Sequence, residues 1–200
     1  MEKYIRQYVA KSIALLGNLC TVEIAKAMNI LQAALERDGR IYVIRNGGSL
    51  ALATHWVADF NKTVFSHNLN EERRRLQAIR LPTTEEELTA WANDIEYDMV
   101  FAGPLQNYIQ DTDVLIAISS SGNSENIIRA VSLARSHQVP VIGISGFDGG
   151  RLNPLSDARI LVSTSPAEYE QVEGIHAVIL HLFTKYFKDY FDSVALLQKS

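Results

Sequence analysis

The chain has 200 residues, of which 47 % are hydrophobic, and its formal net charge is -4 at neutral pH. This length suits one α/β domain, or one domain with a helical extension, and the composition permits a sizeable core. The charge is mild and no long basic cluster is present, because the densest charged run, residues 71–75, mixes both signs. We therefore expect no nucleic-acid partner.

Cys20 is the only cysteine, which excludes a disulfide within the chain and favours a reducing compartment. No apolar run approaches membrane-spanning length, and the first residues lack the apolar core of a signal peptide. We therefore expect a cytoplasmic protein that does not associate with membranes.

Residues 1–38 are predicted to contain a pair of helices that ends before Gly39. Apolar residues recur there at helical spacing, at Ile5, Val9, Ile13 and Leu16 and again at Ile24, Met28, Leu31, Ala34 and Leu35. Helical pairs ahead of a first strand often pack on a partner subunit. We expect these helices to make oligomer contacts; the alternative is that they cover the sheet.

The next segments alternate between strands and helices. A strand at 40–44 leads through Asn46-Gly47-Gly48-Ser49 into a helix that contains His55. Residues 61–75 are polar and are predicted to form a loop, followed by a strand at 76–81. Acidic residues after Thr84 favour the start of a helix, which ends near Asn93-Asp94, and a further helix is expected over 99–109.

The segment from Asp113 to Ile127 is the most informative part of the chain. Its continuous apolar run, 114–118, is typical of a strand buried on both faces, and a helix is predicted over 124–137. Between them stand Ser119, Ser120, Ser121, Gly122, Asn123 and Ser124. A polar loop at a helix N-terminus favours anion binding, so we interpret it as a phosphate cradle. The alternative is a serine-rich turn in which Ser121 or Ser124 caps the helix.

The remaining segments complete an α/β fold. Strands are predicted at 139–145 and 159–163, separated by a loop with Gly149-Gly150, and a long helix at 170–190. In that helix the apolar residues Ile175, Val178, Ile179, Leu182 and Phe183 are expected to face the core. Alternating strands and helices predict a doubly wound, five-stranded parallel sheet. Both polar loops follow strands, so both should line one crevice at the carboxyl edge.

A set of motifs in this order carries a family resemblance. They are Asn46-Gly47-Gly48-Ser49, His55 six residues later, Asn93-Asp94, the run Ser119 to Ser124, Gly149-Gly150, and a last helix with Gly174-Ile175-His176 and His181. Together they resemble the sugar isomerase (SIS) domain, and within it the phosphoheptose, or sedoheptulose 7-phosphate, isomerases. The resemblance covers nearly the whole chain, which we interpret as a single SIS domain over 1–200.

The resemblance implies a three-layer α/β/α sandwich, usually a tetramer with active sites at subunit contacts, that interconverts a ketose phosphate and an aldose phosphate. Sugar hydroxyls would be held by the Asn46-Gly47-Gly48-Ser49 loop and by Asn93 and Asp94. Ser119, Ser120, Ser121 and Ser124 would bind the phosphate. A divalent metal, typically zinc, would be surrounded by His55, Asp59, Glu173 and His181, with Asp59 and His181 as acid/base groups.

Three positions depart from the family pattern: Arg45 replaces a Gly, Asp59 a Glu and Glu173 a Gln. A related SIS branch that interacts with the bacterial replication initiator has lost the acidic group at 59 and the histidine at 181. This chain keeps ionisable groups at both positions, which favours catalysis. The alternative function is a non-catalytic SIS module that binds a sugar phosphate or a protein partner such as that initiator.

The spacing of residues along the helices limits which of the expected metal ligands can meet. His55 and Asp59 are four residues apart, so they share one helix face, an arrangement that is also common in plain surface contacts. Glu173 and His181 are separated by a helical rise of roughly 12 Å, so they could flank a small site only from opposite ends. The expected metal set therefore needs ligands from more than one helix.

Overall fold

The structure is a computed structural model that describes residues 1–47, 50–65 and 74–197. The strands are β1 (Arg40–Arg45), β2 (Gln77–Arg80), β3 (Val114–Ser119), β4 (Val141–Phe147) and β5 (Ala158–Ser163). The α-helices are α1 (Glu2–Gly17), α2 (Thr21–Glu36), α3 (Leu50–Asn61), α4 (Glu85–Asp94), α5 (Ala102–Tyr108), α6 (Glu125–Ser136), α7 (Leu152–Leu155) and α8 (Tyr169–Leu197). Short 3-10 helices are η2 (Thr63–Phe65) and η3 (Tyr97–Met99).

The strands form one parallel sheet in the order β2-β1-β3-β4-β5, which confirms the predicted doubly wound arrangement. The strand order reverses between β1 and β3, where Arg45 is paired with Ile118. In sheets of this kind the connections after the two central strands leave on opposite faces and open a crevice at their carboxyl ends. The loops that begin at Asn46 and Ser120 lie at this edge.

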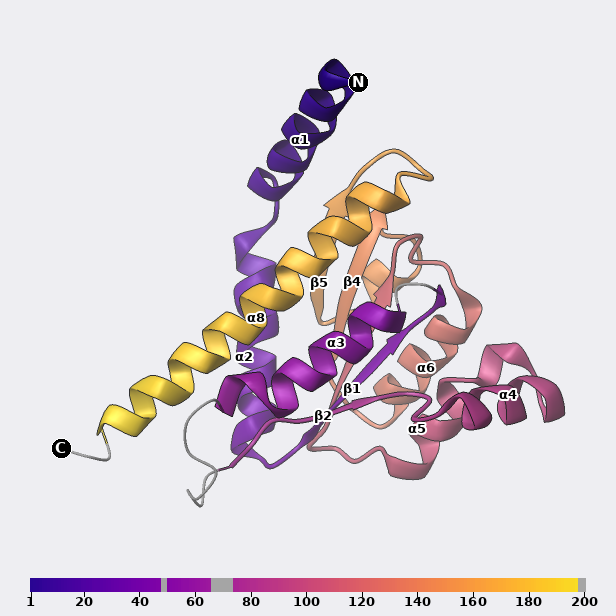
Figure 1. The fold of residues 1–200 in the computed structure, drawn as a ribbon. Coiled ribbons are helices and arrows are strands. Elements are labelled where there is room, and N and C mark those ends of the chain that lie inside the picture. The colour runs from indigo at the N-terminus through magenta and orange to yellow at the C-terminus, as the bar shows by residue number, and fades with distance from the viewer. Residues whose placement is uncertain (48–49, 66–73, 198–200) are drawn as a thin grey trace.

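Helices cover both faces of the sheet, which gives the expected three layers (Figure 1). Because side chains alternate along a strand, Val43 and Ile116 join the core under α2, α3 and α8, whereas Ile44 and Ala117 join the core under α5 and α6. Each core is a cluster of buried apolar side chains. The sheet is therefore buried on both sides, as the apolar run 114–118 predicts.

Helices α3 and α8 lie side by side over one face of the sheet (Figure 1). The indole of Trp56 is buried between them and stacks at a tilt on Phe60, with ring centroids 4.1 Å apart. Its Nε1–H donates a 2.9 Å hydrogen bond to the carbonyl oxygen of Leu180. This bond fixes α3 against α8 one residue away from His55 and from His181.

The outer face of α8 differs from the prediction. Ile175, Ile179 and Phe183 are buried as expected, but Val178 and Leu182 are 45 % and 43 % exposed. The apolar stripe on α8 is wider than its contact with the sheet, so these two residues face outward. The prediction that they point to the core was wrong.

Other boundaries differ by short segments. The helix expected from residue 99 begins at Ala102, because Tyr97–Met99 forms the 3-10 helix η3. The predicted loop at 61–75 starts later than expected, because α3 continues to Asn61 and η2 follows it. Helix α7 was not predicted, since its four residues are too few to show a periodic pattern.

Helix α1 projects beyond the sheet, and its second half lies near the start of α8 (Figure 1). Its contacts with the body include an ion pair between Lys11 and Glu168 and a 2.9 Å hydrogen bond from Ser12 to Gln171. None of its described residues is buried. No single helix in the described ranges is both long and apolar enough to cross a membrane; α1 and α2 pass that test only together, across a 65° bend.

The Trp56 hydrogen bond generates a stability prediction. Trp56→Phe should lower the free energy of unfolding by roughly 1–3 kcal/mol, because it removes a buried hydrogen bond and leaves a small cavity. The matched control is Trp91→Phe, whose ring is only partly buried and should cost less. Equal losses in urea unfolding of the two variants would show that the α3–α8 contact does not depend on this bond.

Candidate functional site

A cavity of about 170 Å³ opens at the carboxyl edge of the sheet, at the point where the strand order reverses. It is lined by Arg45, Asn46, Ile118, Ser119, Ser120, Ser121, Ser124, Tyr169 and Glu173. These residues come from the end of β1, the end of β3 with the loop that follows it, and the first two turns of α8. The structure thus brings all four predicted phosphate-binding serines into one cavity.

The serine loop is shaped by hydrogen bonds of its own. Ser119 Oγ accepts from the backbone N–H of Gly122 at 3.1 Å, and Ser121 Oγ accepts from Asn123 N–H at 3.2 Å. Ser124 occupies the N-cap position of α6, but its side chain makes no capping hydrogen bond and lies 3.4 Å from Ser119 Oγ. Its hydroxyl therefore remains at the cavity, beside the positive end of the α6 dipole.

A second loop, after β4, supports the serine loop from behind. Gly122 and Gly150 have positive φ angles of 64° and 51°, and a Cβ at either would lie 2.0 Å and 2.4 Å from backbone carbonyl oxygens of the opposite loop. The backbones also bond directly, since Leu152 N–H donates to the Gly122 carbonyl at 2.9 Å. The predicted Gly149-Gly150 motif is therefore explained by close packing.

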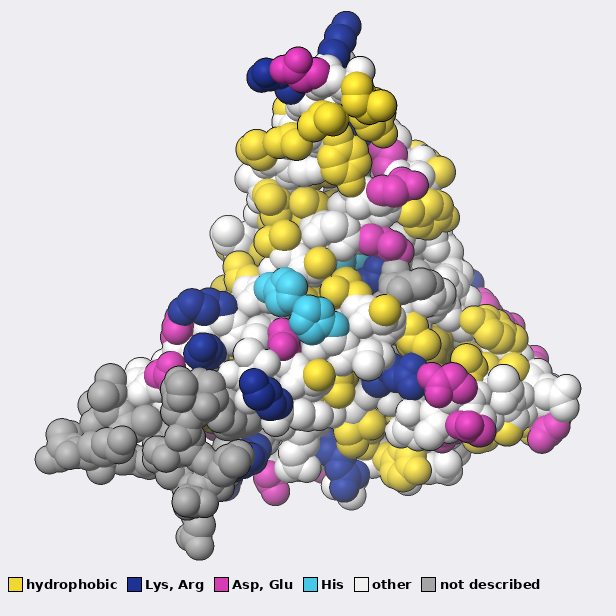
Figure 2. Space-filling model, in the orientation of Figure 1, with side chains coloured by type: hydrophobic (Ala, Val, Ile, Leu, Met, Phe, Trp, Pro, Cys, Tyr) yellow, Lys and Arg dark blue, Asp and Glu magenta, His cyan; other side chains and the backbone are white. Residues whose placement is uncertain are grey.

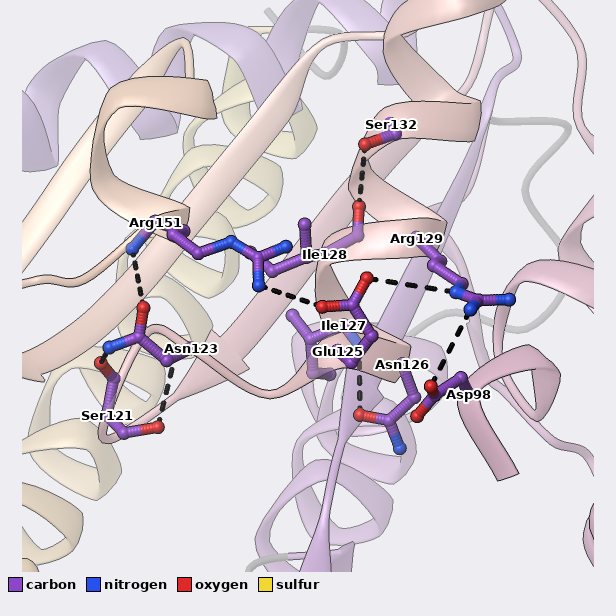
Figure 3. A network of polar contacts seen from close by, with 10 residues as sticks. All are labelled: Asp98, Ser121, Asn123, Glu125, Asn126, Ile127, Ile128, Arg129, Ser132 and Arg151. Atoms are coloured by element: carbon purple, nitrogen blue, oxygen red, sulfur yellow. Dashed lines mark hydrogen bonds and ion pairs between the residues drawn. The ribbon is translucent and has the colours of Figure 1, made fainter. Parts of the chain in front are cut away.

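Charged side chains join the two loops to helix α6 (Figure 3). The Arg151 backbone N–H donates to Asn123 Oδ1 at 3.1 Å, and its guanidinium donates to Glu125 at 2.8 Å. Glu125 also lies 3.8 Å from Arg129, which pairs in turn with Asp98. This network is exposed and orders the rim of the cradle more than it adds stability.

Asn46 connects the two strand ends across the switch point. Its side-chain amide exchanges two hydrogen bonds with the amide of Asn126, at 2.9 Å and 2.8 Å, and Tyr97 Oη donates to its Oδ1 at 3.2 Å. Asn126 is buried and also accepts from the Ile127 N–H. The amide of Asn46 is thus engaged with protein, although the residue lines the cavity.

The cavity wall contains a buried cation. Arg45 is 2 % exposed, and its Nη2 lies 3.3 Å from Oε1 of Glu173, whose side chain is 44 % exposed. Burial lowers the pKa of Arg45 to about 10, a shift that the negative charge of Glu173 opposes. The guanidinium therefore keeps its charge at neutral pH.

His176 lies behind this pair and is fully buried. Its Nε2 is 3.2 Å from the carbonyl oxygen of Ser145. Burial, with the nearby charge of Arg45 as a smaller cause, lowers the pKa of His176 to about 3, so its ring is neutral at physiological pH. The structure thus agrees with a structural role for this histidine.

A second group of polar residues lies on the outer surface of α3 and α8. His55 Nε2 and His181 Nε2 lie 3.7 Å and 4.0 Å from Asp59 Oδ2, and the imidazole centroids are 5.2 Å apart. Thr63 Oγ1 donates to the other oxygen of Asp59 at 2.9 Å. Figure 2 shows these histidine side chains side by side at the surface.

The residues of this group fit a divalent metal. One ligand atom from each of His55, Asp59 and His181 lies within 4.8 Å of the others. Ligands about 2.0–2.2 Å from a tetrahedral ion are separated by roughly 3.3–3.6 Å, so small rotamer changes would close the set. Two imidazoles and one carboxylate suit zinc and leave one position open.

Not every residue of the expected sites joins these two groups. Glu173, expected as a fourth metal ligand, pairs with Arg45 in the cavity instead. Asn93 and Asp94 are exposed at the end of α4 and hydrogen-bond to each other, away from the cavity lining. Gly47 is the last described residue of its loop, and Gly48 and Ser49 lie outside the described residues.

Sequence reasoning assigned no role to several residues of the site. Arg45 was noted only as a departure, although a charged residue that ends an apolar strand was a usable signal. Asn126 and Tyr97 gave no signal, because their partner Asn46 is distant in the chain. Gln171, two residues before Glu173, contacts α1 through Ser12 and does not line the cavity.

Comparisons with known proteins agree with the geometry. Residues 7–146 match the SIS domain family. A phosphoheptose isomerase from Helicobacter hepaticus is 35 % identical over 162 residues, covering 81 % of this chain and 79 % of that protein. One from a Nitratiruptor species is 38 % identical over 149 residues, covering 74 % and 76 %.

Solved structures show the same likeness. The phosphoheptose isomerase of Neisseria gonorrhoeae superposes with a TM-score of 0.81 at 27 % identity, covering 94 % of this chain and 98 % of that one. The enzyme from Francisella tularensis gives 0.80 at 26 % identity, with coverage of 94 % and 97 %. The family match, these relatives and the shared fold show that the chain belongs to the SIS domain family and, within it, to the phosphoheptose isomerases.

Proposed function

We propose that the protein is an aldose–ketose isomerase that converts sedoheptulose 7-phosphate to D-glycero-D-manno-heptose 7-phosphate. The observation that carries the proposal is the presence, on one chain, of a serine-lined cavity at the first turn of α8 and a His–Asp–His group two turns further along it. A substrate with its phosphate several bonds from its carbonyl group could meet both. Relatives named phosphoheptose isomerase support the same assignment.

The phosphate is assigned to the serine cavity. Ser119, Ser120, Ser121 and Ser124 offer hydroxyl donors, and the N-terminus of α6 adds partial positive charge. Gly47 and the backbone near Asn46 are assigned to sugar hydroxyls. Asn93 and Asp94, expected for the same role, lie away from the cavity, so any contact of theirs would require a rearrangement or another subunit.

The reaction is assigned to His55, Asp59 and His181. Interconversion passes through a cis-enediol: a base takes the proton from one carbon and returns it to the neighbour, while a second group moves protons between the oxygens. Asp59 suits the first task, because its carboxylate accepts a hydrogen bond from Thr63 and lies within 4.0 Å of both imidazoles. His181 suits the second. A divalent ion bound there would polarise the carbonyl oxygen.

The surrounding surface supports an oligomer. The His–Asp–His group is exposed on the single chain and lies beside the outward-facing Val178 and Leu182. Apolar side chains also cover α1 (Figure 2), where Ile5, Val9 and Ile13 are at least half exposed. A second copy would cover both surfaces and exclude water from the site, and we propose a homotetramer.

The exposed Cys20 is consistent with the expected reducing cytoplasm.

The first test is catalysis in deuterated water. The protein should incorporate solvent deuterium into sedoheptulose 7-phosphate and form the aldose, and Asp59→Asn should lower kcat by about 10²–10⁴-fold. Asp189→Asn, an exposed aspartate on α8, is the matched control and should keep full activity. Tight sugar-phosphate binding without any exchange would reject the isomerase and support the non-catalytic module.

The second test concerns the metal. Elemental analysis of the purified protein should find a divalent metal, with zinc as the expected ion, and His181→Ala should reduce its content. His137→Ala, an exposed histidine on the opposite layer, and Glu173→Gln should leave the content unchanged. Full activity in a metal-free preparation would leave Asp59 and His181 as a simple acid/base pair.

The third test concerns assembly. Light scattering at micromolar concentration should report an oligomer, and Ile13→Asp should dissociate it by placing a charge on the apolar face of α1. The control Gln7→Asp adds the same charge to exposed α1 at a polar position and should not. A monomeric parent protein would contradict the proposed tetramer.

A further inference from the structure

The proposed isomerase mechanism gives no role to the buried guanidinium of Arg45. Arg45 is the last residue of β1, and the alternation of side chains along the strand places it on the α8 side of the sheet. It lines the cavity together with the four serines, yet it is 2 % exposed. A buried charge is costly unless it is paired and hydrogen-bonded.

The pairing of this cation is incomplete. Neither Nη nitrogen donates a hydrogen bond within the part of the chain that the structure describes. The nearby Glu173 oxygen, 3.3 Å from Nη2, provides charge but not the fork-to-fork geometry that a guanidinium makes with an oxyanion. Arg45 thus brings buried donors without a hydrogen-bond acceptor among the described residues to the wall of the cavity that Ser119 and Ser124 also line.

Glu173 lines the same cavity, directly beside Arg45. Its side chain is 44 % exposed, on the first turns of α8, so it can turn outward without unfolding the helix. As long as its carboxylate stays beside Arg45, it repels an incoming phosphate. Once it turns away, the guanidinium is free to bind the phosphate.

We propose that Arg45 is a direct ligand of the substrate's phosphate monoester, and that Glu173 is a counter-ion which the phosphate displaces from Arg45. This inference rests on the proposed function for the identity of the ligand. It makes Arg45 a binding residue and Glu173 a residue that weakens anion binding in the free protein. Phosphate affinity is then set by competition between two anions for one cation.

The test uses inorganic phosphate and titration calorimetry, with no turnover. Arg45→Met keeps an apolar stem of similar length and should weaken phosphate binding by about 10- to 100-fold, as expected for hydrogen bonds to a charged group. Glu173→Gln should strengthen binding several-fold. Ser121→Ala with Ser124→Ala reports on the cradle itself and should also weaken binding.

The double variant Arg45→Met, Glu173→Gln distinguishes direct contact between Arg45 and phosphate from mere neutralisation of Glu173 by Arg45. If Arg45 only neutralises Glu173, the double variant binds phosphate as tightly as Glu173→Gln alone, and the proposal is wrong. If Arg45 contacts phosphate, the double variant binds at least tenfold more weakly than Glu173→Gln. Arg45→Lys keeps the charge without the fork and should give an intermediate affinity, which covers the case in which Arg45→Met does not fold.

Failure of this inference is distinguishable from failure of the proposed function. Unchanged phosphate affinity in Arg45→Met, in a protein that still isomerises the sugar phosphate, overturns the role of Arg45 alone. A parent protein that binds no phosphate overturns it as well, and the deuterium-exchange assay then decides separately whether the isomerase assignment stands. The expected pattern of affinities in a protein without isomerase activity supports Arg45 as an anion ligand in the non-catalytic module.

Discussion

The approach of two backbones behind the serine loop determines the geometry of the candidate site. The loop after β4 lies so close to the loop after β3 that a side chain at Gly122 or Gly150 would overlap carbonyl oxygens. Hydrogen bonds from Gly146 N–H to the Ser120 carbonyl and from Leu152 N–H to the Gly122 carbonyl close the contact. This backbone contact holds the serine loop in place beside the cavity, although Ser124 makes no capping hydrogen bond to α6.

Local sequence patterns were sufficient for the frame and for the serine cavity. Continuous apolar runs such as 114–118 indicate strands buried on both faces, and polar loops that follow parallel strands must share one edge of the sheet. The His55–Asp59 pair was predictable because a spacing of four residues places both side chains on one helix face. These inferences depend only on neighbours in the chain.

Long-range partners could not be predicted in the same way. Arg45 and Glu173 are both departures from the family pattern, and that they contact each other follows from where α8 begins relative to the end of β1. The Asn46–Asn126 amide pair depends likewise on the alignment of β1 with α6. On α8, periodicity identified the apolar residues but not which of them meet the sheet, so Val178 and Leu182 were assigned to the wrong side.

Helix α8 contributes to both groups of functional residues, with Glu173 in the cavity and His181 beside Asp59. They are eight positions apart, which fixes a rise of roughly 12 Å along the helix, and side-chain rotation alters this separation only slightly. Under the proposed assignment, discrimination between sugars of different carbon number is set by this backbone length and not by any single contact. A shorter sugar phosphate anchored in the serine cavity would leave its carbonyl group short of Asp59. Point substitutions in either group would change rate or affinity, whereas a change of preferred chain length would require inserting or deleting part of a helical turn.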